Sequence, residues 1–274
     1  MKIRPLRSND IPSLLELSQQ AGWNQTQADW ERMIALAPDA CHGIEADDRI
    51  VSSTTGIRHG HDLAWIGMVL THEAHRGRGY ATALVQHAID HLRDKVAWIK
   101  LDATDTGKPV YARLGFQDET EVQRWERKPG PVEKASSYLI HEYAVDPSFD
   151  RAYFGAYRVP LLNALRRDGE SCFVVGYGYA MSRPGARARH LGPCVVRSTE
   201  AARALVEDVL AKHGGESVIW DLFPSNADAV RLAKQYGFQP MRHLTRMALP
   251  CRPDVLPILR NESSVFAIAG FEYG

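Results

Sequence analysis

The chain lacks net charge, clustered cysteines and any long apolar run. Its 33 Lys and Arg residues balance 33 Asp and Glu residues, so no strong field attracts nucleic acid or an anionic membrane. The four cysteines (Cys41, Cys172, Cys194 and Cys251) show no Cys-x-x-Cys spacing, which disfavours a zinc site or a disulfide framework. No run approaches the about eighteen apolar residues of a membrane helix, and the first residues lack the apolar core of a signal peptide. We therefore expect a cytoplasmic protein without a metal, a nucleic-acid partner or a membrane partner.

What is present is the composition of an ordinary globular protein. Apolar residues make up 45% of the 274 positions and charged residues 24%, which is enough for two modest domains or one large one. Eleven histidines show no ligand-like clustering with cysteines or acids. His59 and His61 flank a turn, where we expect solvated side chains and no metal ligands.

The most informative local pattern is a glycine-bearing turn between a strand and a helix. Residues 64–70 form a short apolar run that predicts a buried strand, and residues 81–92 place apolar side chains on one helical face. Between them lies Arg76-Gly77-Arg78-Gly79-Tyr80-Ala81. A helix N-terminus has unpaired N–H groups and favours an anion, and glycine allows phosphate oxygens to approach the backbone. The spacing is neither a dinucleotide fingerprint nor a Walker loop.

A second pattern follows further along the chain. Residues 96–101 predict the next strand, which Asp102 follows. A short helix containing Tyr111 is predicted to end at Gly115, since glycine commonly follows the last helical residue. Phe116 comes next.

These two patterns together resemble the GNAT superfamily of acyl-CoA-dependent N-acetyltransferases. The pyrophosphate loop of that family, Gln/Arg-x-x-Gly-x-Gly/Ala, is matched by Arg76, Gly79 and Ala81. The family's helix with a proton-donating tyrosine ends Tyr-x-x-x-Gly-Phe, which Tyr111-Ala112-Arg113-Leu114-Gly115-Phe116 matches. Two motifs in the right order and spacing are far more specific than either alone.

The order of elements then recurs after a proline- and glycine-rich stretch, residues 127–137, which predicts a linker. The recurring pattern predicts three strands and two amphipathic helices: strands at 171–181, 188–196 and 218–222, and helices at 200–213 and 226–236. Gly237-Phe238 ends the last helix, as Gly115-Phe116 does in the first copy.

The second copy differs where the chemistry is expected. Residues 197–200 replace the glycine turn with Arg-Ser-Thr-Glu, and Ala233 stands where the first copy has Tyr111. Asn226 is interpreted first as a helix N-cap. The chain thus resembles tandem-GNAT proteins of the YitH-like kind, with a catalytic N-terminal domain at 1–130 and a degenerate C-terminal domain at 134–274. The expected fold is α/β with a mixed sheet: each domain has a mostly antiparallel sheet with one splayed parallel strand pair, flanked by helices.

The resemblance implies acetyl-CoA as co-substrate, bound between the splayed strands and at the glycine turn. The strand supplies backbone groups for the pantetheine arm, and the turn supplies N–H groups and arginine charge for the pyrophosphate. These candidate residues are Val69, Leu70, Thr71, Arg76, Gly77, Arg78, Gly79, Tyr80 and Ala81.

Direct attack of an amine on a thioester needs a base for the ammonium and an acid for the departing thiolate. Tyr111 is the candidate acid, and the competing interpretation is a tyrosine packed beneath its helix. Asp102 is the candidate base, and it is also placed to cap the following turn. Glu45 and a water chain remain alternatives for the base.

The acceptor pocket of this fold is lined by the N-terminal helices, which makes Trp23, Asn24, Trp30 and Trp65 candidates. Tryptophan stacks cations and rings, yet it also fills cores. We expect a small primary amine, since no acidic groove for a lysine-rich peptide is evident. Two other functions stay open: a CoA-thioester sensor without turnover, and an acyltransferase that uses a longer acyl-CoA such as succinyl-CoA. A homodimer formed through the second copy is compatible with an active first domain.

Overall fold

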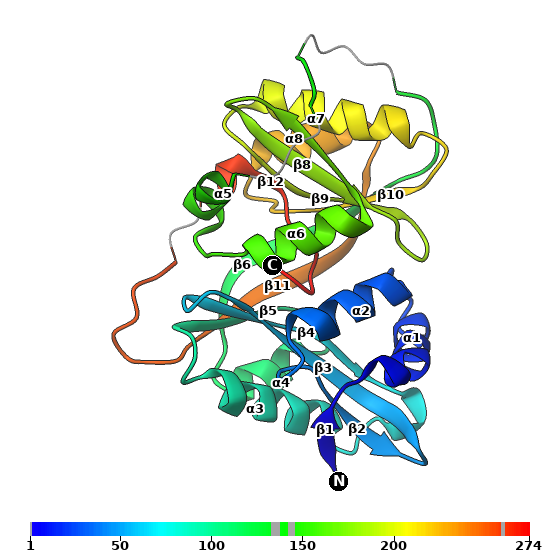
Figure 1. Ribbon diagram of the computed structural model, residues 1–274, viewed down its shortest axis with the longest axis vertical. Helices are drawn as coiled ribbons and strands as arrows, with labels where there is room; N and C mark the ends of the chain where they lie inside the picture. The colour runs from blue at the N-terminus through cyan, green and yellow to red at the C-terminus, as the bar shows by residue number, and fades with distance from the viewer. Residues whose placement is uncertain (1, 133–137, 142–145, 259–260) are drawn as a thin grey trace. The chain divides into compact units, whose positions relative to one another are not determined.

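The computed structural model describes residues 2–132, 138–141, 146–258 and 261–274 (Figure 1). Contacts between Cα atoms divide the chain into two compact units, each built from separate segments. Unit 1 comprises Met1–Glu119, Arg246–Leu256 and Glu272–Gly274, and unit 2 comprises Thr120–Thr245 and Pro257–Phe271. No helix in the described ranges is both long and apolar enough to cross a membrane.

Unit 1 contains a mixed sheet in the order β1-β2-β3-β4-β5, followed by residues 246–250 of β11. Neighbouring strands from β1 to β4 are antiparallel, and β4 and β5 are parallel. Its elements are β1 (Ile3–Pro5), η1 (Ser8–Asp10), α1 (Ile11–Gln20), α2 (Gln27–Leu36), β2 (His42–Ala46), β3 (Arg49–His59), β4 (Leu63–Thr71), η2 (Glu73–His75), α3 (Tyr80–Leu92), β5 (Trp98–Ala103) and α4 (Lys108–Arg113).

The elements of unit 1 that border the glycine turn form where the sequence predicts them. The apolar run at 64–70 lies in β4, where Leu63 to Met68 are buried. Helix α3 buries a stripe of apolar side chains at helical spacing (Leu84, Val85, Ala88, Ile89 and Leu92). Because helices cover the sheet, β3 is buried along almost its whole length. The glycine turn is thereby fixed between two well-packed elements.

Unit 2 repeats this arrangement with its own strands. Its sheet runs from β11 (residues 239–245) through β6, β10, β9 and β8 to β7, and β9 and β10 are the parallel pair. Its elements are β6 (Gln117–Arg127, which begins in unit 1), α5 (Pro147–Phe154), α6 (Val159–Asp168), β7 (Glu170–Val174), β8 (Gly178–Arg183), β9 (Arg189–Val196), α7 (Thr199–Lys212), β10 (Val218–Leu222), α8 (Ala227–Gln235), β11 (Gln239–Pro250), η3 (Glu262–Ser264) and β12 (Val265–Ala267).

One prediction for unit 2 is wrong: residues 171–181 do not form a single strand. They form a hairpin of β7 and β8, whose turn uses Gly176 at φ +76° and Gly178 at φ +142°. Glycine tolerates such angles, and Gly178 also approaches the Val195 carbonyl too closely for a side chain. The other predicted strands and helices of this copy are confirmed within about two residues at each end.

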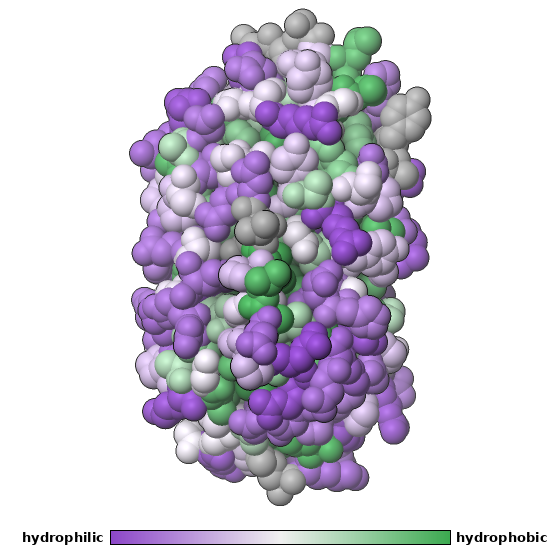
Figure 2. All heavy atoms as spheres, turned by 90° about the vertical axis from the view of Figure 1, so that its left-hand side faces the viewer, coloured by the Kyte–Doolittle hydropathy of each residue, from purple (hydrophilic) through white to green (hydrophobic). Residues whose placement is uncertain are grey.

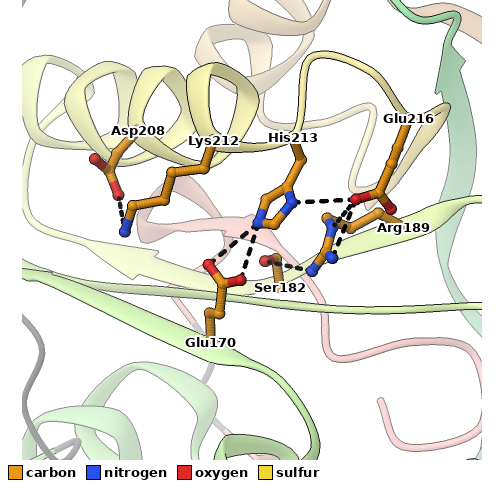
Figure 3. Close-up of polar contacts among 7 residues, drawn as sticks. All are labelled: Glu170, Ser182, Arg189, Asp208, Lys212, His213 and Glu216. Carbon is orange, nitrogen blue, oxygen red and sulfur yellow. Dashed lines mark hydrogen bonds and ion pairs between the residues drawn. The ribbon is translucent and has the colours of Figure 1, made fainter.

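Ionic contacts fix the end of α7 (Figure 3). The two ring nitrogens of His213 lie 3.1 Å from carboxylate oxygens of Glu170 and Glu216, and Arg189 pairs with Glu216 at 3.2 Å. Within the helix, Lys212 pairs with Asp208 at 3.0 Å. Basic groups near a helix C-terminus also favour its dipole. These contacts tie the end of α7 to β7 and β9.

Hydrophilic residues cover most of the face in Figure 2, and apolar residues there form small groups. Six large apolar side chains are exposed in the described residues: Leu139, Tyr157, Val175, Tyr177, Met241 and Leu256. The mixed sheets and parallel pairs confirm the predicted α/β class with two copies of one fold.

Candidate active site

The glycine turn opens the N-terminus of α3. Gly77 and Gly79 adopt φ angles of +75° and +77°, and Gly79 is the N-cap residue, so no side chain caps the helix. A Cβ atom at either glycine would meet no heavy atom of the protein within 4 Å. The backbone angle requires these glycines, while protein packing does not. The space beside the first N–H groups suits an anionic ligand.

The parallel strands beside this turn separate. Backbone pairing between β4 and β5 ends at Trp65 and Lys100, although β4 continues to Thr71 and β5 to Ala103. In β4, Met68 has a φ of +50°, an uncommon angle for a residue other than glycine. The strands therefore form a wedge whose apex lies next to Trp65.

Serine side chains of β3 fix the register along the separated part of β4. Ser53 Oγ donates to the Met68 carbonyl at 2.9 Å, and Ser52 Oγ donates to the Leu70 carbonyl at 2.8 Å. These carbonyls face β3. The backbone groups of Val69, which lies between them, face the wedge, because neighbouring strand residues direct their backbone groups to opposite sides.

A cleft of about 460 Å³ joins the wedge to the turn. Eight of the nine predicted cofactor residues line it: Val69, Leu70, Thr71, Arg76, Gly77, Gly79, Tyr80 and Ala81. Arg78 is not among them, since its guanidinium donates to the Ala74 carbonyl at 3.2 Å. The guanidinium of Arg76 donates to the Thr71 carbonyl at 3.2 Å, so that carbonyl already has a partner.

Tyr111 lies on α4 and lines the same cleft. Tyr111 is half-buried, and its hydroxyl makes no hydrogen bond within the part of the chain that the structure describes. Burial raises the pKa of Tyr111 to about 12, so the phenol is protonated at neutral pH. The ring contacts Phe116 edge-on at 6.2 Å, and the Phe116 N–H donates to the Tyr111 carbonyl at 3.1 Å. The position suits a proton donor.

Asp102 is not at the cleft. Its two carboxylate oxygens accept hydrogen bonds of 2.8 and 2.9 Å from Arg246 of β11, and both side chains are buried. The second copy contains the same pair: Asp221 of β10 accepts two bonds of 2.7 Å from Arg124 of β6. Because the pair recurs in a copy without the tyrosine, its position indicates a structural ion pair and does not support Asp102 as the base.

The predicted acceptor residues are dispersed. Trp30 and Trp65 are fully buried, and Trp30 donates its indole N–H to Ser18 at 3.0 Å. Trp23 and Asn24 are half-buried in the segment between α1 and α2. None of the four lines the cleft. The alternative base Glu45 is hydrogen-bonded to Arg4 and also lies away from the cleft.

The structure adds cleft residues that the sequence patterns did not single out. Leu17 of α1 and Ala21, which directly follows α1, line the cleft, and their only sequence signal is an apolar helical period. His75 lines the cleft next to Tyr80, with ring centroids 6.3 Å apart, and its buried Nδ1 has no partner among the described residues. No carboxylate lines the cleft in the described ranges.

The second copy caps its corresponding helix with its own side chain. The hydroxyl of Ser198 accepts a hydrogen bond of 3.2 Å from the N–H of Ala201, inside the first turn of α7. Glu200 adds an acid there, and Thr199 donates to Asp228. As predicted, Asn226 is the N-cap of α8 and accepts from the Ala229 N–H at 3.0 Å.

The second copy also differs between its parallel strands. Pairing of β9 with β10 ends at Leu191 and Trp220, and β12 then pairs with β9 at Cys194 and Val195. Trp220 donates to the Phe266 carbonyl at 2.7 Å, and the Ile268 N–H donates to the Asp221 carbonyl at 2.9 Å. The chain's own strand therefore occupies the position that corresponds to the wedge of the first copy.

Comparison with known proteins finds a GNAT acetyltransferase domain in each of the two copies. The Acetyltransferase (GNAT) family matches residues 9–116, and an Acetyltransferase (GNAT) domain matches residues 147–254. The chain belongs to the GNAT family of acetyltransferases. It is 23% identical over 224 residues to the uncharacterized N-acetyltransferase YitH of Bacillus subtilis, covering 77% of this chain and 78% of YitH.

Solved GNAT structures share the fold over all or nearly all of the chain. A putative acetyltransferase from Pyrococcus horikoshii superposes with a TM-score of 0.87 at 22% identity, covering 100% of this chain and 95% of its own. A tandem GNAT protein from the clavulanic acid biosynthesis pathway gives 0.66 at 14% identity, covering 93% and 99%. GNAT membership supports transfer of an acyl group from acyl-CoA. No group of three or more potential metal ligands occurs in the described residues.

Proposed function

We propose that the N-terminal copy transfers the acetyl group of acetyl-CoA to a primary amine of a small molecule. The observation that carries this proposal is one cleft that joins an uncapped, glycine-led helix N-terminus, a parallel strand pair separated beyond Trp65, and the hydroxyl of Tyr111. Each part has a use in the reaction. The turn binds pyrophosphate, the wedge binds the pantetheine arm, and the phenol protonates the thiolate.

The wedge offers the backbone of Val69 to the pantetheine arm. Thr71 contributes less than expected, because its carbonyl accepts from Arg76. The neutral amine attacks the thioester carbonyl, the C–N bond forms, and the C–S bond breaks. The departing thiolate takes the proton of Tyr111, and the surplus proton of the acylated nitrogen then restores the phenol. A pKa of about 12 keeps this proton on the phenol until the thiolate forms.

The test is acetyl-CoA binding by calorimetry, followed by thiol release with a panel of primary amines. We expect binding with acetyl-CoA and amine-dependent release of CoA. A longer donor such as succinyl-CoA should release less thiol. Binding of CoA thioesters without turnover on any amine would indicate a CoA-responsive sensor, against which the intact Tyr111 argues.

We further propose that the second copy is degenerate and binds no CoA, and that the first copy is the catalytic one. Support comes from the Ser198 cap, the acids Glu200 and Asp228, and β12 beside β9. A titration of the full chain should give one acetyl-CoA site per polypeptide. A stoichiometry near two would contradict this proposal.

A further inference from the structure

The segment Glu272–Gly274 belongs to unit 1, although it lies far in sequence from the rest of that unit. It is buried: Glu272 is 4% exposed and Tyr273 is 0% exposed. Its contacts include two hydrogen bonds to residues of the N-terminal part, one of them from His59, which is buried and not, as we expected from the sequence, solvated. His59 Nε2 lies 2.9 Å from the Tyr273 carbonyl, and the Tyr273 hydroxyl lies 2.9 Å from the guanidinium of Arg32.

This segment covers one face of β4. A Cβ atom at Gly67 would lie 3.0 Å from the Cα atom of Glu272 and 3.3 Å from its Cβ atom. A Cβ atom at Gly274 would lie 2.6 Å from the ring of Trp65. Trp65 and Gly67 share a face because side chains two apart in a strand point the same way. This segment therefore covers the face of β4 that carries Trp65, a residue predicted to contact the acceptor.

The position of Gly67 places Glu272 beside the wedge. Pairing of β4 with β5 ends at Trp65, and Val69 lines the cleft. Gly67 lies between these two residues. A thioester whose pyrophosphate binds the turn at 76–81 and whose arm follows β4 into the wedge brings its acyl end towards this residue. At that point Glu272, whose side chain ends in a carboxylate, lies against β4 through its backbone and Cβ atom.

We propose that Glu272 accepts the proton of the acceptor ammonium in the N-terminal copy. This inference rests on the proposed acetyl transfer. The carboxylate takes one proton from the ammonium, and the neutral amine then forms the C–N bond. The thiolate leaves with the C–S electron pair and takes the proton of Tyr111, and the second proton lost from the acylated nitrogen restores the phenol. The carboxyl of Glu272 then loses its proton to water.

The variant Glu272→Gln in the full chain tests the proposal, because the amide keeps the shape and cannot accept the proton. Removal of a positioned base costs about 10²–10⁴ in rate, so kcat should fall by at least about a hundredfold. KM for acetyl-CoA should remain within about twofold, because the lost group acts on the amine and not on the cofactor. Glu272→Asp should retain more activity than the glutamine variant.

Chemical rescue separates a proton acceptor from a packing residue. Glu272→Ala should regain part of its turnover when formate is added, and a purely structural defect would not respond. Tyr273→Phe is the control for the segment itself, since it removes the contact with Arg32 and leaves Glu272 in place. It should lower the melting temperature, while its kcat should stay close to that of the wild type.

The outcomes distinguish this proposal from the proposed function. If the wild-type protein acetylates no amine, the proposed function fails and the role of Glu272 fails with it. If the wild type is active and Glu272→Gln keeps its kcat, only the role of Glu272 is refuted. Loss of activity in Glu272→Gln with an equal loss of acetyl-CoA binding and no rescue by formate would also refute it.

Discussion

Substitution of Gly79 by valine tests the cofactor site most directly. The φ angle of +77° means that any side chain adds strain, and the open space beside the residue means that valine would not meet protein atoms. A left-handed backbone angle costs an L-residue about 1–2 kcal/mol, and a branched side chain costs more. The branched carbons would stand where the pyrophosphate approaches the N–H groups of α3.

The chain offers a matched control for the strain. Gly176, in the turn between β7 and β8, has a φ of +76° and likewise no heavy atom within 4 Å of an added Cβ atom. Gly176→Val should therefore cost the same strain at a position far from the cleft residues in sequence. Both variants should melt about 2–8 °C lower than the wild type, at about 2–4 °C per kcal/mol for a protein of this size class.

Only Gly79→Val should lose acetyl-CoA. We expect at least a tenfold rise in Kd, about 1.4 kcal/mol, measured by calorimetry below the melting transition. The control should bind as tightly as the wild type. If both variants melt lower while neither changes its affinity, the turn at 76–81 is not a pyrophosphate site.

Four further substitutions address other parts of the chain. Tyr111→Phe keeps the ring, so turnover should fall about 10²–10⁴-fold while Kd for acetyl-CoA changes little; turnover within about twofold of wild type would make the tyrosine structural. Asp102→Asn removes the negative charge from a buried bidentate ion pair and should cost about 3–5 kcal/mol of stability, seen as a lower melting temperature, as should Asp221→Asn. A large loss of turnover in Asp102→Asn at an unchanged melting temperature would restore that residue as the base. Burial and two neighbouring histidines lower the pKa of His42 to about 4, below its ordinary 6.5. The unfolded chain thus takes up this proton first, and stability should fall between pH 6.5 and 4. His42→Gln should flatten that part of a pH series of denaturant unfolding, and an unchanged slope would contradict the assignment.

Features that depend on short stretches of sequence could be predicted. The glycine turn, the helix that follows it and the strand that precedes it all lie between residues 63 and 92. Periodicity and glycine placement determine such elements locally. The tyrosine helix is equally local, because Gly107 leaves room for the Tyr111 ring: an added Cβ atom there would lie 3.0 Å from it. These parts of the candidate site follow from neighbouring residues alone.

The assignment of Asp102 depended on information that short stretches do not contain. Its position after the second strand suits a base, but its partner Arg246 lies 144 residues away. Neither residue has a sequence context that indicates an ion pair. The corresponding pair of Asp221 and Arg124 spans 97 residues. A bidentate contact between distant strands becomes visible only when the sheet order is known.

The parallel strands β9 and β10 of the second copy show the same limit of sequence-based prediction. Absence of the glycine turn and of the tyrosine could be predicted from residues 197–200 and Ala233, but the strand that lies beyond the paired part of β9 and β10 could not. Backbone groups of a buried strand edge need partners, and an empty edge between β9 and β10 would leave them unpaired. β12 supplies these partners by pairing with β9. Its residues Val265, Phe266 and Ala267 form a short apolar run like many others, so only the pairing reveals their role. The second copy, for which we propose no cofactor, thus keeps its parallel strands apart by placing its own chain between them.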